Sequence, residues 1–113
     1  MRYLLTLLFL FAGNMIFSQT KDISPDDIVP VRGFCIAAPS PDNLEQFIKF
    51  INEEMSVRKV NTLILRVDYN YQYESHPELR DSSALSKKDV KKLVEACRQN
   101  KIRVIPQVNL LGH

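Results

Sequence analysis

The residues best suited to chemistry lie in a long polar and aromatic stretch between positions 68 and 85. Connections of this length in a compact domain are usually functional or disordered. A flat aromatic face beside a carboxylate suits a sugar, because the C–H face of the sugar stacks on a ring while its hydroxyls need hydrogen-bond acceptors. The alternative is that the tyrosines only pack against the rim of the fold, and the sequence favours neither. The side chains concerned are Asp68, Tyr69, Tyr71, Tyr73, Glu74, His76 and Glu78.

Asp68 is the strongest single candidate for a site residue. It follows the apolar run 62–67, in which only Arg66 is charged, and packing alone does not explain a carboxylate at that point. The competing explanation is an ion pair with Arg66 or with Arg32, which stands at the start of an earlier apolar run. We predict a site role for Asp68.

Other familiar kinds of site find little support in the sequence. His76 with Glu74 and Glu78 lacks firm metal-ligand spacing, so we predict no metal site. The turn at 37–41 has no glycine, and the chain has only 3, which argues against a dinucleotide or P-loop site. No complete nucleophile–base motif is present, and no cofactor is implied.

Three short apolar runs predict the strands of an α/β fold. They cover residues 31–38, 62–67 and 102–106, and each pair is separated by a segment with helical periodicity. Right-handed crossovers make such strands parallel, in the order β-α-β-α-β. Ligands of parallel α/β proteins bind where the strands end. We therefore expect a site among the segments 37–41, 68–85 and 107–113.

Both intervening helices are predicted to be amphipathic. Ser40 is expected to cap the first helix with its side chain, with Pro41 at the first helical position, and Ser86 three residues before Asp89 has the spacing of a capping box. Asn100 is expected to end the second helix. The apolar positions at helical spacing are Leu44, Phe47, Ile48, Ile51 and Met55, then Val90, Leu93, Val94 and Cys97.

The N-terminal residues have the pattern of a secretory signal peptide. Residues 1–18 combine a positive start, an apolar run and small Ser18 as a cleavage point. The alternative, an uncleaved anchor, is disfavoured because Asn14 interrupts a run already short for a membrane span. We expect a linker over 19–30, a folded domain over 31–113, a secreted or periplasmic protein, and no stable membrane insertion after cleavage.

Composition and charge exclude further classes. The chain has 113 residues with 15 Lys+Arg against 13 Asp+Glu, and a net charge of +2 gives no field for nucleic acid. Two cysteines cannot form a disulfide-dense mini-protein. We expect Cys35 and Cys97 to be buried free thiols, with one disulfide between them as the alternative.

Three segments resemble glycoside hydrolase family 20, the β-N-acetylhexosaminidases. They are Arg32-Gly33-Phe34, the run 61–68 that ends in Asp68, and the run 105–113 that ends in Gly112-His113. The resemblance implies that residues 31–113 are the first three βα units of a (β/α)8 TIM barrel. Because the chain stops before a helix that would cover its third strand, we expect a truncated barrel.

The resemblance also implies roles for single residues. Arg32 would bind hydroxyls of the terminal sugar, Asp68 would support the site, and His113 would be the histidine partner of Asp68. Together with Tyr69 of the aromatic stretch, these residues form the predicted substrate-binding set. The family's catalytic Glu and adjoining Asp would follow His113, and they act with the substrate's own acetamido group.

Two departures from the family pattern leave an alternative open. Gln107 and Asn109 stand where the family motif has acids, and Leu111 replaces a proline. Amides keep the shape of a carboxylate but lose its charge. The sequence thus predicts a secreted glycosidase acting on terminal glycosidic bonds of glycans when full length, the fragment alone being inactive. The alternative is a non-catalytic carbohydrate-binding barrel.

Overall fold

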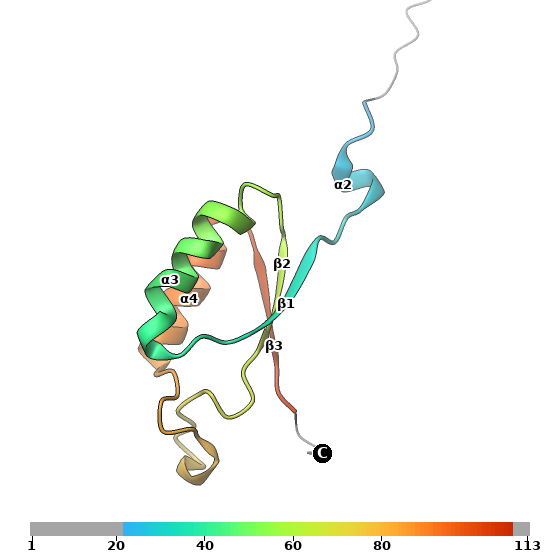
Figure 1. Cartoon of the computed structure of the whole chain (residues 1–113). Helices are drawn as coiled ribbons and strands as arrows, with labels where there is room; N and C mark the ends of the chain where they lie inside the picture. Colours follow the sequence, from blue (N-terminus) through green and yellow to red (C-terminus); the bar gives the residue numbers. More distant parts are fainter. Residues whose placement is uncertain (1–21, 110–113) are drawn as a thin grey trace, which may run out of the picture.

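The computed structural model describes residues 22–109, in which three parallel strands carry two helices on one face (Figure 1). The strands are β1 (Gly33–Ala37), β2 (Thr62–Arg66) and β3 (Arg103–Gln107), arranged in the order β1-β2-β3. Cys35 lies opposite Ile64, which lies opposite Ile105. The predicted parallel β-α-β-α-β order is confirmed.

The first crossover begins with a tight turn and ends with a widened one. A 3-10 turn, η1 (Pro41–Asn43), leads into α3 (Leu44–Phe50), and a π-helical turn, η2 (Ile51–Met55), follows. Ser40 does precede the first turn, but its hydroxyl accepts from the Asn43 side-chain amide at 3.1 Å and caps no backbone N–H. The predicted side-chain cap is therefore wrong, because the local Asn43 amide takes the hydroxyl.

The second crossover helix has the predicted ends. Helix α4 (Lys87–Gln99) starts at a complete capping box: the Ser86 hydroxyl accepts the Asp89 N–H at 3.2 Å, and the Asp89 carboxylate accepts the Ser86 N–H at 3.0 Å. Asn100 ends the helix, and its side chain donates to the Ala96 carbonyl at 2.8 Å. These local signals need no tertiary context, which is why the sequence carries them.

The core lies between the helices and the near face of the sheet. Leu63 and Leu65 of β2 both point toward the helices, because every second side chain of a strand lies on the same face of the sheet. Burying such side chains stabilises the fold by about 1.5–3 kcal/mol each. The buried core residues are Leu44, Ile51, Met55, Leu63, Leu65, Leu85, Leu93, Ala96, Cys97 and Ile102.

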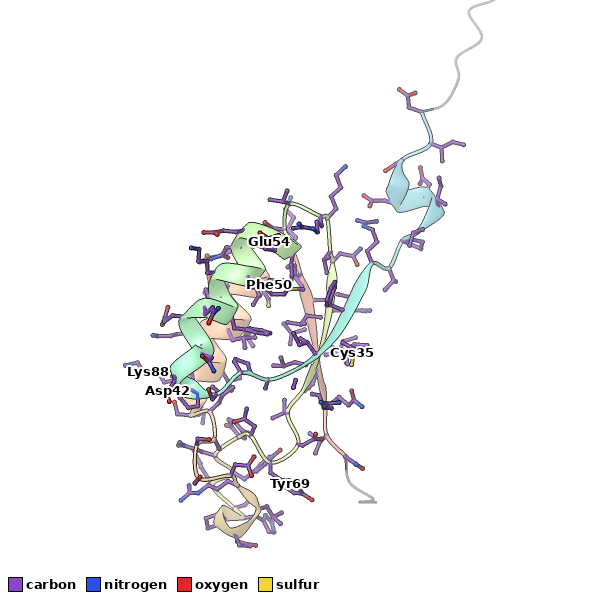
Figure 2. The ribbon with its side chains drawn as sticks, in the orientation of Figure 1. Cys35, Asp42, Phe50, Glu54, Tyr69 and Lys88 are labelled. Atoms are coloured by element: carbon purple, nitrogen blue, oxygen red, sulfur yellow. The ribbon has the colours of Figure 1, made fainter. Side chains whose placement is uncertain are left out.

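The far face of the sheet has no helix over it among the described residues, and this corrects one expectation. Cys35 lies on that face (Figure 2), where it is exposed, while Cys97 is buried as predicted, and both thiols are free. The error over Cys35 arises because an apolar run does not tell which face of a sheet is covered. Val94 of α4 is also 44% exposed, because it lines an open apolar groove that β3 borders as well.

Before β1, the segment predicted to be a linker contains a one-turn helix, α2 (Pro25–Ile28). The Ser24 hydroxyl accepts the Asp26 N–H at 3.2 Å at its start. The proposed signal peptide, residues 1–18, lies outside the described residues, as does His113. Within 22–109, none of the helices has the length and apolar character needed to cross a membrane.

Candidate functional site

Asp68 lies at the carboxyl end of the central strand in an unusual backbone conformation. Its φ of 43° places it in the left-handed region, which non-glycine residues rarely adopt and Asp and Asn tolerate best. Its Oδ1 accepts the backbone N–H of Asn109 at 3.0 Å, and its Oδ2 lies 3.8 Å from Nε of Arg66. The carboxylate therefore joins the exits of β2 and β3, and it is 35% exposed.

A polar layer lies beside Asp68 on the helix-free face of the sheet. Ala37, Arg66 and Gln107 occupy matching positions on the three strands. The Cys35 thiol, one layer nearer the amino ends, donates to Oε1 of Gln107 at 3.7 Å, so these two side chains share that face. The layer offers one guanidinium, one amide and a small alanine beneath Asp68.

Asn70 connects this edge to the loop that follows β1. Its side-chain amide donates to the carbonyls of Ala38 at 3.1 Å and Pro39 at 2.9 Å. Its own backbone N–H donates to the Val67 carbonyl at 2.7 Å, which closes a tight turn around Asp68. The exits of all three strands are thus held together by the short segment 68–70.

The three tyrosines fall into two groups. Tyr71 and Tyr73 pack edge to face with ring centroids 5.2 Å apart, and the Tyr73 hydroxyl donates to the Asp68 carbonyl at 2.7 Å. Burial, with smaller effects from Asp68 and Tyr71, raises the pKa of the Tyr73 phenol. Tyr69 is 52% exposed near the carboxyl ends of the strands (Figure 2). Packing accounts for Tyr71 and Tyr73, whereas a sugar contact remains a prediction for Tyr69.

Arg32 lies at the opposite end of the sheet from Asp68. Its Nε donates to the Lys59 carbonyl at 2.7 Å, its Nη1 donates to the Val29 carbonyl at 2.8 Å, and Nη1 also pairs with Asp26 at 2.5 Å. The structure therefore brings Asp68 and Arg66 together but leaves Arg32 apart from them. His113 lies outside the described residues, so its pairing with Asp68 stays a prediction.

The candidate metal ligands do not converge. His76 accepts or donates a hydrogen bond with the neighbouring Ser75 hydroxyl at 2.9 Å, and Glu74 lies 4.0 Å from Lys87. Across the described part of the chain, no three His, Cys, Asp or Glu side chains are close enough to hold a metal ion.

Two site residues were not singled out as such from the sequence. The sequence predicts Arg66 only as an ion-pair partner, although its position two residues before Asp68 places it on the face shared by alternate strand residues. Asn70 carries a weaker signal, since an Asn shortly after a strand end is typical of a turn, but its side-chain bonds to Ala38 and Pro39 are long-range and appear only in the folded chain. Both signals are common, which is why they did not stand out.

A parallel sheet whose polar side chains gather where the strands end is the arrangement of α/β ligand-binding and catalytic domains. The chain matches no known protein-family model. It is 27% identical to Beta-hexosaminidase 1 of Coccidioides posadasii (strain RMSCC 757 / Silveira) over 115 aligned positions, which cover 89% of this chain and 18% of that protein.

The fold is similar to that of a glycoside hydrolase family 20 beta-N-acetylglucosaminidase. The TM-score is 0.52 at 17% identity, covering 71% of this chain and 20% of the solved one. The chain therefore spans about a fifth of the length of both proteins. Sequence and fold together give a partial similarity to glycoside hydrolase family 20, in agreement with the resemblance noted in the sequence.

Proposed function

We propose that this chain supplies the first three βα units of a (β/α)8 barrel in a secreted or periplasmic glycoside hydrolase-like protein. The full-length protein would hydrolyse terminal glycosidic bonds of glycans, with N-acetylhexosamine as the first candidate sugar. The observation that carries this proposal is the similarity to a beta-hexosaminidase across 89% of the chain. Residues 1–18 would be the signal peptide, 19–30 a lead-in, and 31–113 the barrel segment.

The flanks of the helix-and-sheet layer support a barrel. A largely apolar groove of about 540 Å³ runs along β3 and α4, and Val94, Val104 and Val108 help to line it. Smaller grooves of about 260 and 300 Å³ border β1 and α3, both beside Phe50. One further βα unit on each side would cover these surfaces and pair the two outer strands, as closure of a barrel does.

In such a barrel, the helix-free face of the sheet would become the interior. Asp68, Arg66 and Gln107 would then stand at the carboxyl mouth, which is where TIM-barrel enzymes bind substrate. Asp68, His113 and Tyr69 are the proposed substrate-binding residues of this mouth. Arg32 is proposed as a fourth, and that role requires its guanidinium to exchange its present carbonyl partners for sugar hydroxyls.

The catalytic acid and its adjoining carboxylate are proposed to follow His113, so residues 1–113 would be inactive alone. The residues up to position 113 contribute positioning. The Asp68 carboxylate, held by the Asn109 N–H beside the Arg66 guanidinium, orients a polar substrate without rearranging.

The test compares full-length protein with two variants on 4-nitrophenyl N-acetyl-β-D-glucosaminide and on the matching glucoside. Asp68→Asn should lower turnover at least tenfold, about 1.4 kcal/mol of barrier. Asp42→Asn is the matched control, because Asp42 lies at the start of the helical layer (Figure 2) and is exposed. Unchanged kinetics in Asp68→Asn would remove Asp68 from the site, and no hydrolysis of any glycoside would refute the enzyme.

A second function is favoured by one observation. Gln107 and Asn109 place amides at the carboxyl edge, and Gln107 Oε1 accepts from the Cys35 thiol. A site with fewer charges suits retention of a sugar better than acid–base chemistry. The alternative is therefore a non-catalytic carbohydrate-binding barrel. Saturable binding to immobilised glycans with no turnover would support it over the hydrolase.

A further inference from the structure

The guanidinium of Arg66, at the end of the central strand β2, has few polar partners among the described residues. Its side chain is 56% exposed, and among the described residues its one ion pair is the 3.8 Å approach of Nε to Asp68. That separation is too long for a hydrogen bond. A guanidinium has five N–H donors, and none of them is hydrogen-bonded within residues 22–109.

The groups around Arg66 do not neutralise it fully. Its register partners are Ala37, which is small, and Gln107, which is neutral. Asp68 is the single described carboxylate within 4.0 Å of it, and Oδ1 of that carboxylate already accepts the Asn109 N–H. An exposed pair at such a distance contributes roughly 0–1 kcal/mol. Among the described residues, this layer therefore offers guanidinium N–H donors without a hydrogen-bond partner, beside the small side chain of Ala37.

An apolar layer next to Arg66 raises the free-energy cost of leaving its positive charge without a partner. Ile64 and Ile105 lie one step nearer the amino ends on the same face. If the face becomes a barrel interior, as proposed above, an arginine above this floor is partly removed from water. A charge in such surroundings is costly unless an opposite charge meets it.

We propose that Arg66 binds an anionic substituent of the sugar, so that the substrate class is an acidic sugar bearing a carboxylate or a sulfate. The planar guanidinium matches either group with two parallel N–H···O bonds. Gln107 beside it donates through its amide without repelling the anion, as a carboxylate there would. This inference rests on the proposed binding of glycans and adds the charge of the sugar to it.

The experiment measures binding by the full-length protein to two matched pairs of sugars by calorimetry. One pair is glucose and glucuronate, and the other is N-acetylglucosamine and its 6-sulfate. We expect the acidic member of at least one pair to bind roughly tenfold more tightly, a difference of about 1.4 kcal/mol that shrinks as salt is added. The pair that shows the difference identifies carboxylate or sulfate.

Three variants assign the effect to Arg66. Arg66→Gln should abolish the acidic preference, so that the acidic and the neutral member of each pair bind with equal affinity. Arg66→Lys keeps the charge but loses the fork, and should retain only part of the preference. Arg103→Gln is the matched control, because Arg103 is exposed on the same face at the amino end of β3 and should leave the preference intact.

The outcomes separate this inference from the proposed function. Tight binding of neutral sugars with no acidic preference would overturn the inference and leave the function standing. An acidic preference that survives in Arg66→Gln would overturn it as well, because the anion would then be held elsewhere. If none of the four sugars binds, both the glycan site and the inference fail.

Discussion

The backbone at Asp68 allows a prediction that separates strain from hydrogen bonding. With φ at 43°, any L-residue with a Cβ is disfavoured there, glycine is not, and Asp or Asn is tolerated through local hydrogen bonds. Asp68→Ala removes the acceptor of the Asn109 N–H and keeps the strain. Asp68→Gly removes the acceptor and relieves the strain. Asp68→Asn keeps both the acceptor and the tolerance.

The expected magnitudes follow from these differences. Loss of the exposed hydrogen bond costs about 0.5–1.5 kcal/mol in both Ala and Gly variants. Left-handed strain destabilises the Ala variant by a further ~1–2 kcal/mol. The Gly variant avoids this strain but loses more backbone entropy on folding, which reduces the difference in stability between the two variants. We therefore expect Asp68→Ala to be about 1 kcal/mol less stable than Asp68→Gly. Asp68→Asn should lie within about 0.5 kcal/mol of the parent protein.

Urea unfolding of the full-length variants, with equal m-values required, measures this order. Equal stability of the Ala and Gly variants would contradict the left-handed conformation at Asp68. Asparagine keeps an Oδ1 that can accept the Asn109 N–H. A large loss of stability in Asp68→Asn would therefore contradict the view that this hydrogen bond is the main stabilising contact of the Asp68 side chain. If the order holds, a fall in turnover in Asp68→Asn comes from the lost charge and not from misfolding.

The remaining predictions concern the capping box, the thiols and the isolated segment. Ser86→Ala should cost about 1 kcal/mol in thermal unfolding. In the parent protein, hydrogen bonds from the side chain and the backbone of Ser86 lower the pKa of the Asp89 carboxyl group. That contribution is complete above the ordinary pKa of aspartate and is lost as pH falls through the lowered value, so the gap between variant and parent should narrow in acid. A gap that widens in acid would contradict this. Cys35 should react with iodoacetamide in the folded protein and Cys97 only after unfolding, because burial raises the pKa of Cys97 to about 11; equal rates would refute the burial. Residues 19–113 expressed alone should bind a hydrophobic dye and melt without cooperativity, since both flanks are apolar; a cooperative monomeric melt would overturn that expectation.

Local signals in the sequence were sufficient for part of this fold. The capping box at Ser86 and the end at Asn100 depend on residues within one turn of each other, so a single sequence contains them. The strands were found because their runs are β-branched and aliphatic. The exposure of Cys35 was not predictable, because it depends on which face the helices cover. The π-turn over Ile51–Met55 leaves the spacing of apolar residues almost unchanged, so it too escaped.

The candidate site was predicted in the same uneven way. Asp68 was found because a carboxylate at the end of an apolar strand is rare, and one of its two anticipated partners, Arg66, is its neighbour in the structure. The position of Arg32 at the other end of β1 follows from the strand's direction and length. The link from Asp68 to Asn109 spans 41 residues of sequence and is visible only once β2 and β3 are paired.

The segment 68–70 has a consequence for the thermodynamics of ligand capture. It bonds the loop after β1 through Asn70 and the exit of β3 through Asp68, so three chain segments share one set of restraints before any ligand arrives. Ordering loops on association commonly weakens binding, and here that entropy is lost during folding instead. A ligand at this edge should therefore bind with a small entropic penalty and a fast, single-step association. Truncating the Asn70 side chain should make the association entropy more unfavourable while leaving every direct contact in place.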